Sequence, residues 1–171
     1  MNASGCGVTV KEYGHALAAD PEYAERASRI AELTRDLSEL LPDIGPRLKP
    51  LLHPPERRPL TRLTLHPPCS LQHGQQLRGT IEATLDDLGF EVQLAPAESH
   101  LCCGSAGTYS ILQPKLSTEL RDRKLAQLGM LDTQAIVSAN IGCIQHLQSG
   151  TTTPVKHWIE VLDEALAGGQ R

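Results

Sequence analysis

The sequence predicts an α/β fold: a three- to four-stranded parallel sheet with crossover helices, preceded by a helical N-terminal arm. Two observations predict it. After residue 60, short apolar runs alternate with stretches of helical periodicity, as parallel strands joined by helices require. Before residue 60, an amphipathic stretch leads into a segment rich in proline. A chain of 171 residues can bury one core, since a domain of this size hides roughly 70% of its unfolded surface.

The N-terminal arm is expected to hold one amphipathic helix over 21–41, where apolar side chains recur at three- and four-residue steps. Asp20, followed by a proline, suits the N-cap of this helix. Several prolines and a glycine fall within 42–59, and they predict an extended connector. We therefore expect residues 1–60 to form the arm and its connector, and residues 61–171 to form the main cysteine-rich domain.

The main domain follows a repeated order of apolar run, turn and helix. Strands are expected at 62–66, 90–94, 135–139 and, as a short fourth, 154–156, and helices at 75–88, 114–128 and 157–166. The aromatic residues are only one Trp, three Tyr and one Phe. We therefore expect a core built mostly of aliphatic side chains.

The composition excludes several classes of protein. The formal net charge of -4 is spread along the chain without blocks, which argues against a nucleic-acid partner. No window approaches the roughly 18 consecutive apolar residues of a transmembrane helix, and the opening MNASGCG lacks the features of a signal peptide. These observations predict a cytoplasmic protein without a transmembrane segment.

The cysteines carry the chemistry. There are five, an odd number, and two of them are adjacent; adjacent cysteines seldom pair, so metal binding or redox chemistry is favoured over a disulfide framework. Cys69 follows the first predicted strand, Cys102 and Cys103 follow the second, and Cys143 follows the third. Because the carboxyl ends of parallel strands meet at one edge of a sheet, we expect these four thiols to converge. Four thiolates satisfy an iron-sulfur cluster or a zinc ion equally well.

Other candidate residues carry weaker signals. Free cysteine often behaves as a small buried hydrophobe, and for Cys6 that interpretation stands beside a functional one. His146, which lies three positions after Cys143, is a possible ligand, but we expect it to support the site through a hydrogen bond or a helix contact. His66 and His100 lie close to the cysteines in sequence and are expected to orient their loops rather than to bind metal.

Three segments, HPPCSLQHGQ, LCCGSAGTYSILQP and NIGCIQHL, carry a family resemblance. In this order they resemble the cysteine-rich CCG domains shared by heterodisulfide reductase subunits and several hydroxyacid dehydrogenase subunits. Within that family the segments are most similar to the iron-sulfur subunits of glycolate oxidases. The resemblance runs from about residue 64 to the last predicted helix and extends weakly into the opening NASGCGVTVKEYG.

The resemblance implies an organisation that spacing alone does not. Members of the family usually carry two cysteine-rich repeats, and Gly5 and Cys6 look like the counterparts of Gly142 and Cys143. Residues 1–60 would then contain the end of a truncated first repeat. The partners implied are the rest of a longer subunit and a flavin-containing catalytic subunit that oxidises glycolate or a similar 2-hydroxy acid.

One position departs from the family pattern. Heterodisulfide reductases end the third segment with Cys-x-x-Cys, and the additional cysteine helps to hold a noncubane cluster, whereas this chain has His146. A [4Fe-4S] cluster, a zinc ion and a metal-free site all stay open. The leading hypothesis is an electron-transfer subunit, inactive by itself and possibly peripheral at the inner membrane face through its complex. The alternative is a zinc-stabilised or metal-free interaction module without a redox role.

Overall fold

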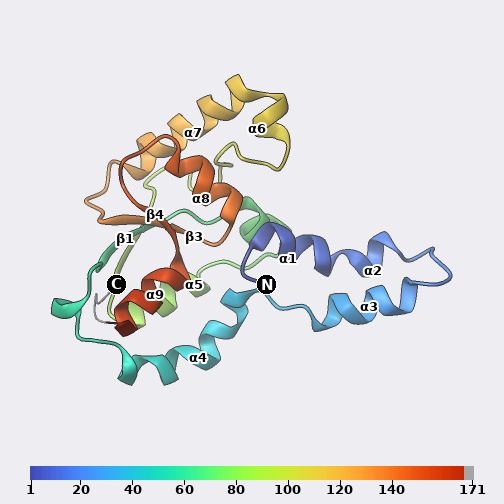
Figure 1. The fold of residues 1–171 in the computed structure, drawn as a ribbon, viewed down its shortest axis with the longest axis horizontal. Helices are drawn as coiled ribbons and strands as arrows, with labels where there is room; N and C mark the ends of the chain where they lie inside the picture. The colour runs from blue at the N-terminus through green and yellow to red at the C-terminus, as the bar shows by residue number, and fades with distance from the viewer. Residues whose placement is uncertain (168–171) are drawn as a thin grey trace.

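The computed structural model describes residues 1–167 and has a parallel four-stranded sheet at its centre (Figure 1). The strands are β1 (Arg62–Leu65), β2 (Glu91–Leu94), β3 (Ala135–Ser138) and β4 (Val155–His157), in the spatial order β2-β1-β3-β4. Leu63 of β1 pairs with Val92 on one side and Ala135 on the other, so β1 lies between β2 and β3. The α/β prediction is confirmed.

Helices cover both faces of the sheet (Figure 1). On one face lie α4 (Leu41–Leu48), α5 (Thr80–Asp87) and α9 (Trp158–Ala167), and on the other lie α7 (Pro114–Leu128), with the short α6 (Tyr109–Leu112) before it, and α8 (Ile141–Gln148). The sheet is therefore buried between two helical layers, as a parallel sheet requires. Within residues 1–167, none of these helices has the length and apolar character needed to cross a bilayer.

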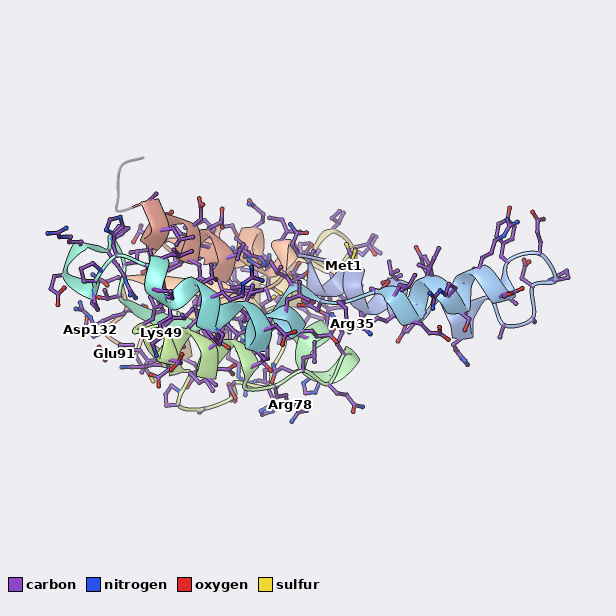
Figure 2. The ribbon with its side chains drawn as sticks, turned by 90° about the horizontal axis from the view of Figure 1, so that it is seen from below. Met1, Arg35, Lys49, Arg78, Glu91 and Asp132 are labelled. Atoms are coloured by element: carbon purple, nitrogen blue, oxygen red, sulfur yellow. The ribbon has the colours of Figure 1, made fainter. Side chains whose placement is uncertain are left out.

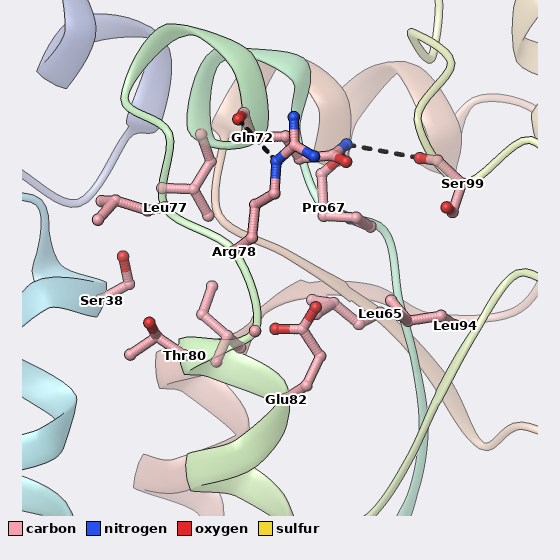
Figure 3. A pocket seen from close by; sticks show the side chains of 13 residues that line it. Ser38, Leu65, Pro67, Gln72, Leu77, Arg78, Thr80, Glu82, Leu94 and Ser99 are labelled. Carbon is pink, nitrogen blue, oxygen red and sulfur yellow. Dashed lines mark hydrogen bonds between the residues drawn. The ribbon is translucent and has the colours of Figure 1, made fainter.

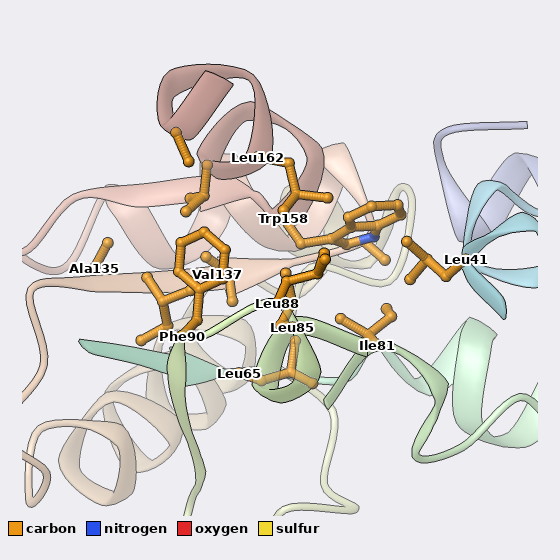
Figure 4. Packing of buried hydrophobic residues seen from close by; sticks show 14 of the residues in the cluster. Leu41, Leu65, Ile81, Leu85, Leu88, Phe90, Ala135, Val137, Trp158 and Leu162 are labelled. Carbon is orange, nitrogen blue, oxygen red and sulfur yellow. The ribbon is translucent and has the colours of Figure 1, made fainter. Parts of the chain in front are cut away.

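The alternation of side chains along the strands divides the core into two clusters. Val137 of β3 faces the layer of α4, α5 and α9, where Trp158 is fully buried (Figure 4). Ile136 faces the opposite layer and packs in a second cluster with residues of α7 and α8. Cys103 and Cys143 belong to this second cluster. The candidate site is thus built on the α7 and α8 side of the sheet.

The N-terminal arm contains α1 (Ser4–Lys11), α2 (Tyr13–Ala16) and α3 (Ala24–Leu33), and the α2–α3 hairpin extends away from the sheet (Figures 1 and 2). The single helix predicted over 21–41 is wrong, because α3 ends at Leu33. A capping box then starts the separate turn η1 (Leu37–Leu40). The Asp36 carboxylate accepts from the Ser38 N–H at 3.0 Å, and the Glu39 carboxylate accepts from the Asp36 N–H at 2.7 Å.

The segment over 42–59 is not the extended connector that its prolines predicted. It contains most of α4 and two short 3-10 turns, η2 (Lys49–Leu51) and η3 (Pro55–Arg57). Pro42 lies in the first turn of α4, where a helix tolerates a missing N–H, and Pro46 gives up one helical hydrogen bond. Leu41 is fully buried in the core. Burial of this apolar face offsets the lost bond, which the proline content alone did not reveal.

Candidate metal centre

The four predicted site cysteines lie in the segments that follow three neighbouring strands, at the carboxyl edge of the sheet. Cys69 directly follows the turn after β1 and precedes the short π-helical turn η4 (Ser70–Gly74). Cys102 and Cys103 lie in the loop after β2, and Cys143 lies in the first turn of α8, after β3. Because β1 lies between the other two strands, the Cys69 loop is flanked by the two other cysteine loops.

The thiols form a connected group. The sulfur atoms of Cys69 and Cys102 are 4.0 Å apart. The sulfurs of Cys103 and Cys143 and a ring nitrogen of His66 all lie within 4.8 Å of one another. Cys103 and Cys143 are buried and Cys69 and Cys102 are half-buried. The structure therefore brings together all four cysteines that the sequence selected.

Hydrogen bonds among the thiols divide them into donors and acceptors. Thiol donors from Cys103 and Cys69 lower the pKa of Cys102, and the Gly104 N–H, 3.3 Å from the Cys102 sulfur, lowers it further. A hydrogen bond from Cys103 also lowers the pKa of Cys143, against the effect of burial. The pKa values of Cys69 and Cys103 are raised, chiefly by their bonds to Cys102. Cys102 and Cys143 are therefore favoured as thiolates, and a bound metal would take the place of the protons on Cys69 and Cys103.

Gly104 shapes the loop that carries the adjacent cysteines. Its φ of +93° lies in the region that side chains rarely adopt, and a Cβ atom there would come within 2.3 Å of the Ser117 carbonyl oxygen. The Ser117 hydroxyl donates to the Gly104 carbonyl at 2.8 Å. The loop is thus pressed against α7, and only glycine fits at this position.

His146 lies behind the same loop. Its Nε2 atom is 3.1 Å from the Ser117 hydroxyl and 3.2 Å from the Ser117 carbonyl oxygen. A carbonyl can only accept, so Nε2 carries the proton and donates. A protonated Nε2 has no free lone pair for a metal. This arrangement supports the structural role expected of His146.

His66 is the residue that the sequence interpretation undervalued. It follows β1, its side chain is 1% exposed, and neither ring nitrogen has an oxygen or nitrogen partner among residues 1–167. Strand alternation contained the signal, because Leu63 and Leu65 face the α5 and α9 layer. Thr64 and His66 therefore face the opposite layer, where Cys103 lies. His100, by contrast, is exposed, and its carbonyl oxygen lies 3.3 Å from Nε2 of His73.

Lys124 of α7 is a second residue that the sequence interpretation missed. Its side chain is buried, and its ammonium group donates to the carbonyl oxygens of Glu98 and Ser99 in the loop before the adjacent cysteines. Burial lowers the pKa of Lys124, while the charges of Cys103, Glu98 and Cys102 oppose that shift. A buried cation on this side of the sheet favours negative charge at the thiols.

Asn140 links the site to the N-terminal arm. Its Nδ2 atom donates to the Cys143 sulfur at 3.6 Å, and its Oδ1 atom accepts from the Gly5 N–H at 3.2 Å. The start of α1 therefore lies against the loop of Cys143. Cys6, one residue after Gly5, is exposed to solvent, unlike the four clustered cysteines.

A cavity of about 280 Å³ lies beside the Cys69 loop, next to the N-terminal end of α5 (Figure 3). Its walls are mainly apolar, and Leu65, Leu71 and Ile81 contribute to them. Gln72 donates from Nε2 to the Pro67 carbonyl at 2.7 Å, and Arg78 donates from Nε to the Gln72 carbonyl at 3.2 Å. Polar groups of the cavity wall therefore hold the chain on both sides of Cys69.

The donor set fits a thiolate-bound metal. Sulfur atoms with one imidazole suit iron-sulfur clusters or zinc, and the orphaned buried nitrogens of His66 point to a partner beyond the protein's own oxygen and nitrogen atoms. A family model matches residues 63–148, which include all four clustered cysteines, and its description is CCG, cysteine-rich domain. The chain belongs to this family.

Curated relatives of this CCG-domain chain are named as iron-sulfur or lactate utilization proteins. The chain is 48% identical over 169 residues to the glycolate oxidase iron-sulfur subunit of Escherichia coli K12, covering 97% of this chain and 39% of that protein. It is 30% identical over 157 residues to the probable glycolate oxidase iron-sulfur subunit of Bacillus subtilis 168, covering 87% and 33%. It is 28% identical over 176 residues to lactate utilization protein A of Anoxybacillus flavithermus, covering 94% and 68%. The chain thus spans well under half of the first two relatives.

Proposed function

We propose that this chain is the electron-transferring part of an iron-sulfur subunit in a glycolate oxidase type complex. Its cofactor would be a single cluster, of the [4Fe-4S] type, held by Cys69, Cys102, Cys103 and Cys143. Bound there, an iron-sulfur cluster accepts and passes on single electrons. The electrons would come from a flavin-containing partner subunit that oxidises glycolate or a similar 2-hydroxy acid.

The convergence of four thiols at one sheet edge is the observation that carries this proposal. Two of the sulfurs are buried and two are half-buried, so the site combines a dry interior with a side open to a partner. Lys124 and the amide of Gly104 place positive charge and a hydrogen bond near the sulfurs. Such groups stabilise an anionic cluster and raise its reduction potential.

Anaerobic reconstitution with iron and sulfide tests the proposal. We expect broad visible absorption that bleaches on reduction, together with bound iron and sulfide. Each of Cys69→Ser, Cys102→Ser, Cys103→Ser and Cys143→Ser should lower the iron content, whereas the matched control Cys6→Ser should not. A protein that stays colourless, or a Cys6→Ser variant that loses as much iron as the others, contradicts the proposed cluster site.

A zinc-stabilised interaction module is the second candidate function. One observation favours it: His66, Cys103 and Cys143 lie within 4.8 Å of one another. Metal–sulfur and metal–nitrogen bonds of zinc are about 2.3 and 2.1 Å, so a small inward movement of these donor atoms would let them bind one ion. Stoichiometric zinc in a colourless protein, with no uptake of iron and sulfide, is the result that selects this alternative.

A further inference from the structure

We infer that His66 supplies a nitrogen ligand to the metal held by Cys103 and Cys143. This inference rests on the proposed function and goes beyond it, because it adds a donor other than cysteine to the site. It also assigns that donor to His66, at the end of β1, and not to His146, which lies in α8 after Cys143.

The backbone of β1 fixes the direction of the His66 side chain. The His66 N–H donates to the Val137 carbonyl at 2.8 Å, and the Ser138 hydroxyl donates to the His66 carbonyl at 2.9 Å. These bonds continue the pairing of β1 with β3 by one residue. Alternation along β1 then directs the imidazole to the α7 and α8 layer, which contains Cys143. The position of the ring therefore follows from the sheet and not from a mobile loop.

The surroundings of the imidazole point to a metal. Buried polar groups almost always have a hydrogen-bond partner, yet neither ring nitrogen of His66 has an oxygen or nitrogen partner among residues 1–167. A hydrogen bond between His66 and the Cys143 sulfur contributes to the lowered pKa of Cys143. The ring faces two thiols, and one of its nitrogens lies within 4.8 Å of both sulfurs. Donor atoms on one tetrahedral ion lie about 3.6–3.8 Å apart, so a small inward movement of these side chains would let all three bind one metal. Ligation would give a ring nitrogen a stronger partner than the thiols beside it.

His146 provides the contrast. Its Nε2 atom donates to the Ser117 carbonyl, which occupies that nitrogen, and the ring is only half-buried. Neither ring nitrogen of His66 is bonded to an oxygen or nitrogen atom of residues 1–167, and the ring is almost fully buried beside the thiols. The ring of His66 therefore faces the sulfurs, whereas the Nε2 atom of His146 is held by Ser117.

Ligation by imidazole has an electrochemical consequence. Imidazole is neutral, so a site with His66 carries one negative charge fewer than a site with a further thiolate, and its reduction potential is higher for that reason. We expect His66→Cys to lower the reduction potential of the reconstituted protein.

Pulsed electron paramagnetic resonance tests the ligand directly. The protein is labelled with ¹⁵N-histidine, reconstituted with iron and sulfide, and reduced to a paramagnetic state. We expect a strong nitrogen hyperfine coupling that disappears in His66→Gln and persists in His146→Gln. In metal-retention assays, His66→Ala should weaken metal binding by more than about 100-fold. Loss of a residue that only hydrogen-bonds to a ligand costs about 10- to 100-fold, so a larger loss indicates that a ligand has been removed. His100→Ala, at an exposed position, serves as the control.

The outcomes separate the two proposals. A reconstituted cluster without nitrogen coupling, or with a coupling that His66→Gln leaves intact, overturns the role of His66 and leaves the proposed function standing. If the wild-type protein takes up no cluster, the proposed function fails, and Co²⁺ is titrated into the same variants. Equal Co²⁺ affinity and visible spectrum in the wild type and in His66→Ala would then overturn the inference independently. Absence of any nitrogen coupling in the reconstituted wild-type protein overturns the inference without depending on whether a variant folds.

Discussion

Substitution of Gly104 by alanine should disrupt the loop of the adjacent cysteines. The new methyl group would lie 2.3 Å from the Ser117 carbonyl oxygen, 3.1 Å from Cβ of Leu120 and 3.2 Å from Nε2 of His146. The first contact is with backbone, so α7 and the loop must move apart. Because the Gly104 N–H donates to the Cys102 sulfur, that movement also disturbs the metal site.

The expected magnitude combines two costs. A residue other than glycine at a φ of +93° costs about 2 kcal/mol of backbone strain, and relief of the clash costs about 2 kcal/mol more. The sum of about 4 kcal/mol is a large part of the roughly 5–15 kcal/mol that stabilises a typical domain. Gly107→Ala is the matched control, because Gly107 also has a positive φ, of +59°, but a Cβ atom there meets no atom within 4 Å. We expect it to cost only about 1 kcal/mol.

Urea unfolding followed by circular dichroism measures both variants, and iron retention after reconstitution provides the second measurement. Gly104→Ala should unfold at a much lower urea concentration than Gly107→Ala with a similar slope, and it should retain less iron. Equal losses of stability in the two variants would refute the reasoning, because strain alone would then explain both. Normal iron content in Gly104→Ala would show that the loop does not position Cys102.

Three further substitutions test hydrogen bonds around the site and in the N-terminal arm. His146→Ala should destabilise the protein by about 1 kcal/mol through the lost hydrogen bond and leave bound metal in place; stoichiometric loss of metal with an intact circular dichroism spectrum would contradict this. Asn140→Leu removes a donor to the Cys143 sulfur and should lower the reduction potential measured by redox titration, since hydrogen bonds to sulfur raise it. Burial raises the pKa of Glu39, but its hydrogen bond from Lys11 and other contacts outweigh burial, so the net pKa lies below 4.5. The stability gained from the ionised Glu39 is present above the ordinary carboxyl pKa and lost as pH falls through the lowered pKa. The deficit of Glu39→Gln in urea unfolding should therefore shrink as the pH is lowered from neutral through that pKa.

The strands were predictable because a parallel sheet buries both of its faces. Each strand is then a short apolar run bounded by turns. Three predicted strands differ from those of the structure by one residue at one end, and the fourth is shifted by one residue. The helix predicted over 21–41 failed although its stop signal was present. Asp36 and Glu39 form the spacing of a capping box, but the apolar periodicity continues through it. Periodicity reports which side chains can share a face and not whether the backbone between them stays helical.

The sequence by itself determined which cysteines gather. Cys69, Cys102, Cys103 and Cys143 follow successive strands, and chain order alone brings the ends of parallel strands to one edge.

Only the tertiary structure decided the roles of the histidines. His146 is turned toward Ser117 because α7 packs against α8, and His66 faces the sulfurs because the pairing of β1 with β3 fixes its side of the sheet. Both contacts join segments far apart in the chain. Alternation along β1 indicates which face of the sheet His66 occupies. The partners of both histidines, however, depend on how helices pack across the sheet, which the neighbouring residues in sequence do not specify.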